Sequence, residues 1–305
     1  MLASSIIVVV GPTSSGKSAL AVRLAKKFNG EIISADSRQV YKGLDIGSGK
    51  ITKREMRDIP HHLLDVASPR RKFTVAQYQK FARLAMQDII SRGKVPIICG
   101  GTGFYIDALL GRVTIPSVSP NTKLRVKLEK LSTEKLGEKL KILDPKRFTD
   151  IDQNNRPRLI RAIEIAVVLG QVPPLTSGIK GRPLTPKGDP WNSFQIGIRL
   201  DQEKLRKNIH ERLLKRFRLG LIAEVKKLHQ NGLSWKRLEA LGLEYRYIAR
   251  YLQNKLTEEE MLKQLKTASW HYAKRQMTWW KHDKTIHWIK NYREGERLTR
   301  DFLKK

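Results

Sequence analysis

The chain has 305 residues, 40% of them apolar, and its 60 lysines and arginines against 29 acidic residues give a net charge of +31. This length can bury one large core or two smaller ones, and the charge favours a polyanionic partner, nucleic acid before an anionic membrane surface, with simple solubility as the alternative. The single cysteine, Cys99, excludes a disulfide within the chain and a cysteine-based zinc site. No apolar run reaches the roughly 20 residues that span a bilayer, so we expect a cytoplasmic protein without a membrane segment.

The first hundred residues alternate between strand and helix patterns. Continuous apolar runs at Ile6–Val10 and Val95–Cys99 predict strands that are covered on both faces, and Glu31–Ala35 is predicted to be a further strand. Helical periodicity appears at Ala19–Phe28 and again over residues 74–92. Strands and helices in alternation, with short connections, predict a parallel α/β sheet flanked by helices.

The character of the chain changes near Pro116. Residues 121–143 are rich in lysine, leucine and glutamate, which predicts a helix, and a second helix is predicted at Arg156–Leu169. Residues 173–186 are rich in proline and glycine, a composition typical of a loop.

A strand pattern returns at Phe194–Leu200, and the chain is then predicted to be helical from Asp201 almost to Trp280. We therefore expect an all-helical domain, residues 117–190, inserted into an α/β core formed by residues 1–116 and 191–305.

Residues 11–18, Gly-Pro-Thr-Ser-Ser-Gly-Lys-Ser, match the pattern G-x-x-x-x-G-K-[ST] between a predicted strand and a predicted helix. Glycines let the backbone curl so that amide N–H groups point inward, and the following helix adds the positive end of its dipole. Lys17 supplies a charge for a diphosphate or triphosphate, and Ser18 supplies a hydroxyl for Mg²⁺. The pattern predicts a P-loop that binds phosphate.

The pattern does not identify the phosphate compound. An NTPase or kinase also needs an acidic residue at the end of a neighbouring strand to hold Mg²⁺. The strand Val95–Cys99 ends in Gly-Gly-Thr, and Asp65, after two leucines, is a weak substitute. An ATP-dependent small-molecule kinase is therefore the weaker alternative.

Asp36 directly follows the predicted strand Glu31–Ala35. The carboxyl ends of the strands in an open α/β sheet face the ligand crevice, so Asp36 is expected near the Gly11–Ser18 loop. The position suits a general base or a metal ligand. A turn or helix-capping acid is the alternative, because the run Asp-Ser-Arg-Gln is typical of such turns.

Six segments, in chain order, can be compared with known families: GPTSSGKS at 11–18, SADSRQVYKGLDIGSGK at 34–50, PHHLLDV at 60–66, GGTGFYIDALL at 100–110, NNRPRLIRAIEI at 154–165 and AKRQMTWWK at 273–281. Together they resemble the tRNA dimethylallyltransferases. The resemblance implies a P-loop NTPase-like core. It also implies transfer of a dimethylallyl group from dimethylallyl diphosphate to the exocyclic N6 of the adenine beside the anticodon, in tRNAs that read codons beginning with U.

The resemblance also implies roles for individual residues. Asp36 would take the N6 proton, and Thr102 would line the reaction channel. Arg212 and Arg216 resemble the arginine helix of the family; they lie four residues apart on one helix face, and both are candidates for stabilising the leaving diphosphate. Ser18 would hold Mg²⁺. The residues expected at the diphosphate are Gly11, Pro12, Thr13, Ser14, Ser15, Gly16, Lys17 and Ser18.

A further set of residues is expected to contact tRNA. Its members are Asp36, Ser37, Arg38, Gln39, Thr102, Lys123, Pro157, Arg158, Leu159, Ile160, Arg161, Lys274, Arg275 and Gln276. Arg125 is an alternative to Lys123. In residues 274–281, cations are expected on phosphates and rings on bases, and at least one tryptophan is expected to pack in the core instead.

Two other functions fit the sequence less well. An enzyme that prenylates free adenine nucleotides would not need so basic a surface or so long a C-terminal helical region. A catalytically silent RNA-binding protein would not need Lys17, Ser18 and Asp36 together. A monomeric tRNA-modifying enzyme is the preferred hypothesis.

Overall fold

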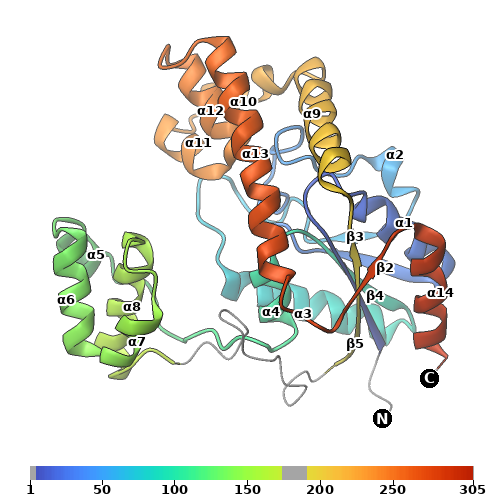
Figure 1. Cartoon of the computed structure of the whole chain (residues 1–305), viewed down its shortest axis with the longest axis horizontal. Helices are drawn as coiled ribbons and strands as arrows, with labels where there is room; N and C mark the ends of the chain where they lie inside the picture. Colours follow the sequence, from blue (N-terminus) through green and yellow to red (C-terminus); the bar gives the residue numbers. More distant parts are fainter. Residues whose placement is uncertain (1–4, 174–190, 305) are drawn as a thin grey trace. The chain divides into compact units, whose positions relative to one another are not determined.

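The computed structural model describes residues 5–173 and 191–304, which form a sheet of six strands with flanking helices (Figure 1). The order across the sheet is β3-β2-β4-β1-β5-β6, and every pairing is parallel. The strands are β1 (Ser5–Val10), β2 (Gly30–Ser34), β3 (His61–His62), β4 (Val95–Cys99), β5 (Asn192–Ile198) and β6 (Ile286–Ile289). The predicted parallel α/β sheet is confirmed.

The central strand β1 explains why its sequence is a continuous apolar run. Val8 is paired with Ile98 on one side and with Gln195 on the other. Ile6 and Val8 point into one hydrophobic core, whereas Ile7 and Val9 point into a second core on the opposite face of the sheet. Both faces are covered, so alternation with polar residues is absent.

Helices from distant parts of the chain cover the two faces. α1 (Lys17–Lys27) and α14 (Tyr292–Leu303) contribute to the core beside Ile7. The helices that contribute side chains to the opposite core are α3 (Val75–Ser91), α4 (Gly103–Leu109), α10 (Leu221–Gln230), α11 (Trp235–Leu241), α12 (Leu243–Leu252) and α13 (Glu258–Trp280). The short α2 (Lys53–Met56) and the long α9 (Gln202–Arg218) complete this part of the molecule.

The described residues form two compact units, one of residues 5–112 and 191–304 and one of residues 113–173. The second unit is entirely helical, with α5 (Thr122–Glu129), α6 (Thr133–Leu143), α7 (Pro145–Asp150) and α8 (Arg156–Leu169). The predicted helix over 121–143 is divided into two, because the Ser132 side chain accepts from the Lys135 amide and starts α6 anew. The predicted insertion at 117–190 overlaps this unit, and its C-terminal limit and most of the predicted loop at 173–186 lie outside the described residues.

Among the described helices, none combines the length and the apolar character needed to cross a membrane.

Candidate active site

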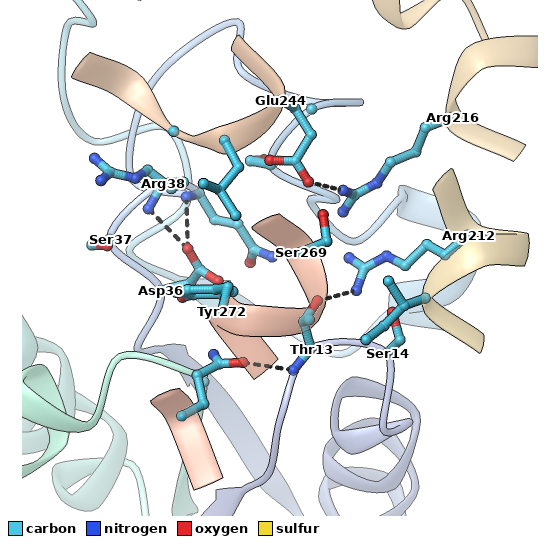
Figure 2. A pocket seen from close by; sticks show the side chains of 18 of the residues that line it. Thr13, Ser14, Asp36, Ser37, Arg38, Arg212, Arg216, Glu244, Ser269 and Tyr272 are labelled. Carbon is cyan, nitrogen blue, oxygen red and sulfur yellow. Dashed lines mark hydrogen bonds and ion pairs between the residues drawn. The ribbon is translucent and has the colours of Figure 1, made fainter. Parts of the chain in front are cut away.

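A cavity of about 370 Å³ opens where β1, β2 and β4 end at their carboxyl edges (Figure 2). The Gly11–Ser18 loop and the turn that starts at Asp36 form one side, and side chains of α9, α12 and α13 form the other. This is the edge of a parallel sheet where ligands bind in α/β proteins. The volume is sufficient for a small diphosphate ester.

The Gly11–Ser18 loop ends at the start of α1. Gly16, the N-cap residue, has a left-handed backbone (φ 91°) and no side chain to accept from the first amides of the helix. A Cβ at this position would lie 2.5 Å from the Tyr292 hydroxyl, so the position also requires glycine sterically. Uncapped amides at a helix N-terminus are donors suited to an anion.

Three side chains from the C-terminal third of the chain hold this loop. Asn208 Nδ2 donates to the Ser14 carbonyl at 3.1 Å, and the Tyr292 hydroxyl donates to the Gly16 carbonyl at 3.1 Å. Gln276 Oε1 accepts from the Thr13 amide at 2.8 Å. Sequence reasoning missed Asn208 and Tyr292, because neither belongs to a recognisable motif.

Two cations meet at the loop. Lys17 Nζ donates to the Pro12 carbonyl at 3.1 Å, and burial lowers the pKa of this amine. Arg212 Nη1 donates to the Thr13 hydroxyl at 3.1 Å, and burial, with the charge of Arg216, lowers the pKa of Arg212 to about 10. Within the described residues neither cation has a carboxylate within ion-pair distance, so the site carries positive charge that an anionic ligand would neutralise.

The structure separates the two arginine candidates. Arg216 is buried and donates to Glu244 Oε1 at 2.5 Å, so its charge is compensated within the protein. Arg212 points to the loop instead (Figure 2). Arg212 is therefore the arginine that faces the expected diphosphate position.

Asp36 lines the same cavity. Its Oδ1 accepts from the Arg38 amide at 2.8 Å and from the Gln39 amide at 3.4 Å, which is the turn-stabilising role considered above. One carboxylate oxygen thus orients the residue, and no hydrogen bond to Oδ2 is found among the described residues. Asp36 can therefore stabilise the turn and act as a general base.

Thr102 has a supporting position. Its Oγ1 accepts from the Ser37 amide at 3.1 Å, and its own amide donates to the Ala35 carbonyl at 3.1 Å. Of the residues that the structure describes, those lining the cavity do not include Thr102. Its hydroxyl connects the segment after β4 to the turn that carries Asp36, and the expected place of Thr102 in the reaction channel stays a prediction.

The α13 segment contains both buried and exposed candidates. Gln276 is only 6% exposed, and its Nε2 donates to the Gly101 carbonyl at 2.9 Å while Oε1 accepts from the Thr13 amide. Both polar side-chain atoms are thus bonded within the protein, and the tRNA contact expected of Gln276 stays a prediction. Lys274 and Arg275 are exposed, as RNA contact requires. Trp280 is buried, which confirms the expectation that at least one tryptophan packs in the core.

The second unit holds the predicted tRNA-contacting segment Pro157–Arg161 on α8. Leu159 and Ile160 belong to the hydrophobic core of this unit, so their side chains are directed inward, and the tRNA contact of the segment stays a prediction. Pro157 and Arg158 are exposed on the same helix. Arg161 is partly buried and donates to Glu164 at 3.2 Å.

Glu164 also distinguishes the surroundings of the two alternatives, Lys123 and Arg125. Its buried carboxylate accepts from Arg125 Nη2 at 2.6 Å, so that guanidinium is committed to a structural ion pair. Lys123 is exposed and stays the candidate.

Asp65, the weak candidate for holding Mg²⁺, and His62 on the nearby β3 are used structurally. Asp65 accepts from Lys50 Nζ at 2.6 Å, and His62 Nε2 lies 2.8 Å from Glu31. The described residues contain no group of three or more His, Cys, Asp or Glu arranged to hold a metal ion.

A comparison with protein families matches residues 39–283 to the model of IPP transferase. The chain belongs to the IPP transferase family. It is 40% identical over 292 residues to tRNA dimethylallyltransferase 1 of Geotalea uraniireducens, covering 94% of this chain and 93% of that protein. It is 40% identical over 291 residues to tRNA dimethylallyltransferase of Anoxybacillus flavithermus, covering 94% and 91%.

Solved structures of IPP transferases share the fold. The full-length tRNA isopentenylpyrophosphate transferase of Bacillus halodurans has a TM-score of 0.72 and 33% identity, covering 99% of this chain and 96% of its own. A eukaryotic dimethylallyltransferase acting on tRNA has a TM-score of 0.79 and 25% identity, covering 99% and 80%. The resemblance found in the six sequence segments is confirmed.

Proposed function

We propose that the protein transfers a dimethylallyl group from dimethylallyl diphosphate to the N6 amine of the adenine beside the anticodon, in tRNAs that read codons beginning with U. The observation that carries the proposal is the placement of Lys17 and Arg212, without a carboxylate partner, at the Gly11–Ser18 loop, in a cavity that Asp36 also lines. The same cavity thus offers cations for an anionic leaving group and a carboxylate that can act as a base.

The reaction divides between these two ends. As N6 bonds to the allylic carbon, the bond from that carbon to the diphosphate oxygen breaks, and its electron pair leaves with the diphosphate. Lys17, Arg212 and the open amides of α1 stabilise that growing charge. Asp36 accepts the proton that N6 loses, which leaves the transferred group on a neutral amine.

Mg²⁺ is part of the same proposal. In sites of this kind the ion is held by one or two protein oxygens, substrate phosphate oxygens and water. Ser18 lines the cavity and is exposed there, so its hydroxyl fits as the protein ligand. When bound, Mg²⁺ would neutralise part of the diphosphate charge.

The net charge of +31 supports tRNA as the acceptor. Arg38, at the cavity, and the exposed Lys274 and Arg275 of α13 are the proposed phosphate contacts in the first unit. An adenine stacked beside the anticodon must leave the stack to enter a cavity of this kind.

Two observations disfavour a kinase. β4 is followed by Gly100-Gly101 where a kinase-like Mg²⁺ site has an acid, and Asp65, the other candidate acid, is paired with Lys50.

The proposal also includes a monomeric protein in the cytoplasm, which size measurement in solution and localisation in cells would test.

A single assay tests the function. The purified protein is incubated with Mg²⁺, dimethylallyl diphosphate and either unmodified tRNA or free AMP, and the nucleosides are analysed by mass spectrometry. We expect prenylated adenine from the tRNA alone. Lys17→Gln should abolish the product, whereas Lys80→Gln, an equal charge change at an exposed position of α3, should not. Transfer to AMP alone, or ATP hydrolysis without transfer, would overturn the proposal.

A further inference from the structure

We propose that Gln276 is a positioning residue that holds the Gly11–Ser18 loop in register with the turn carrying Asp36. The inference rests on the proposed prenyl transfer, because that reaction needs the leaving group and the base at fixed separation. Gln276 lines the cavity, but both of its polar side-chain atoms are bonded within the protein, so it acts through the loop and the turn.

Both atoms of the Gln276 amide have a partner in the catalytic framework. Oε1 accepts from the Thr13 amide at 2.8 Å, and Nε2 donates to the Gly101 carbonyl at 2.9 Å. A Cβ on Gly101 would lie 2.2 Å from Nε2, so glycine at this position allows the close approach. The side chain is 6% exposed, which shields both hydrogen bonds from water.

The contact with Gly101 continues to Asp36. The next residue, Thr102, donates from its amide to the Ala35 carbonyl and accepts from the Ser37 amide, each at 3.1 Å. Ala35 and Ser37 flank Asp36 directly. A continuous path of hydrogen bonds and covalent bonds therefore runs from Thr13, through Gln276 and Thr102, to the turn of the base.

This path joins the two ends of the reaction. The nucleophile must be held in line with the breaking carbon–oxygen bond, and a displacement of about 1 Å can cost a factor of about 100 in rate. The side chain must both donate and accept, since the Thr13 amide needs an acceptor and the Gly101 carbonyl needs a donor. Few residues satisfy both needs in one plane, and glutamine is one of them.

This requirement gives a test that a packing role would not pass. In Gln276→Glu, a protonated carboxyl group both donates and accepts as the amide does, whereas the ionised form cannot donate to Gly101. The charged side chains that line the cavity are the same in both proteins: Lys17, Asp36, Arg38, Arg212, Arg216, Glu244, Arg246 and Arg275. The ratio of variant to wild-type kcat therefore removes the pH dependence that both proteins share.

The experiment measures kcat and KM for tRNA and for dimethylallyl diphosphate between pH 6 and pH 9, with the wild-type protein, Gln276→Glu, Gln276→Met and a control, Gln79→Met. Gln79 also donates its side-chain amide to a carbonyl, that of Ala108, away from the cavity lining. We expect the Gln276→Glu ratio to fall about tenfold or more as the pH rises. Gln276→Met should lose kcat by about the same factor with little change in KM for tRNA, and Gln79→Met should match the wild type.

A pH-independent Gln276→Glu ratio, or a wild-type kcat in Gln276→Met, would overturn the inference while leaving the proposed function intact. If Gln276→Met does not fold, the pH ratio of Gln276→Glu still decides. Absence of prenyl transfer by the wild-type protein would overturn the proposed function, and this inference with it.

Discussion

Arg216 donates to the carboxylate of Glu244 at 2.5 Å, one helical turn beyond Arg212 on α9. Arg216 is thus bound to Glu244, whereas Arg212 is directed to the Gly11–Ser18 loop, where it donates to the Thr13 hydroxyl. Two arginines that the sequence cannot distinguish therefore differ in their partners, and the difference has a measurable consequence.

Arg212→Gln should lower kcat about 100-fold or more, because it removes a charge that stabilises the departing diphosphate. Arg216→Gln should mainly lower the free energy of unfolding, by about 3 kcal/mol, because the partly buried Glu244 loses its partner. Steady-state kinetics and urea unfolding measure the two effects.

The control is the double variant Arg216→Gln with Glu244→Gln, in which no charge is left unpaired and most of the stability should return. Equal losses of kcat in the two single arginine variants would contradict this division of roles.

Asp36→Asn should fold normally and bind tRNA, because an asparagine oxygen still accepts from the Arg38 and Gln39 amides. Its single-turnover rate should fall by about 100-fold or more, because an amide cannot accept the N6 proton. Binding is measured with labelled tRNA and turnover by quench-flow. A variant with an unchanged rate would exclude Asp36 as the base.

Asp107 makes stability depend on pH. Burial raises the pKa of this carboxyl to about 6, although Arg112 and the hydrogen bond from Trp279 lower it. Because the folded state holds the proton more tightly than the unfolded chain, unfolding free energy should fall as pH rises from about 4 to 6, by up to about 3 kcal/mol.

Asp107→Asn removes the fall of the unfolding free energy with rising pH and keeps an acceptor for the Trp279 indole N–H. The variant should match the wild type near pH 4 and exceed it in unfolding free energy at pH 8, where denaturant titrations compare them. A variant that is less stable than the wild type at pH 8 would show that the charge of Asp107 is stabilising.

tRNA affinity should fall steeply with added salt if the basic surface contacts phosphates. Lys274→Gln and Arg275→Gln should each reduce the slope of log Kd against log salt by about one, and Lys80→Gln on α3 should change it little. Fluorescence anisotropy over a salt series measures these slopes. An unchanged slope in the α13 variants would remove these two residues from the tRNA contact.

Much of the fold was predictable from local sequence. The bounds predicted for β4 and α8 agree with the structure, because an apolar strand is bounded by glycine and a helix is bounded by the Asn155 cap and Gly170. β3 and β6 were missed, since strands of two and four residues with histidines give no periodic signal. The amphipathic α14 was missed as well.

The site was predictable only where it is a local motif. Lys17 and Asp36 lie in short segments whose order along the chain already indicates a sheet edge. Asn208, Gln276 and Tyr292 contact loop residues that lie 194, 263 and 276 positions away. Such pairings depend on tertiary packing, which no local pattern encodes.

These sequence separations also determine when each contact can form during translation. The Gly11–Ser18 loop leaves the ribosome among the first residues, yet its partners on α9, α13 and α14 are translated only after position 207. A nascent chain that already contains β1 to β5 still lacks Gln276 and Tyr292. We therefore expect ribosome-bound intermediates to hold β1 to β5 without a working catalytic centre, so that prenyl transfer begins only once almost the whole chain has been made.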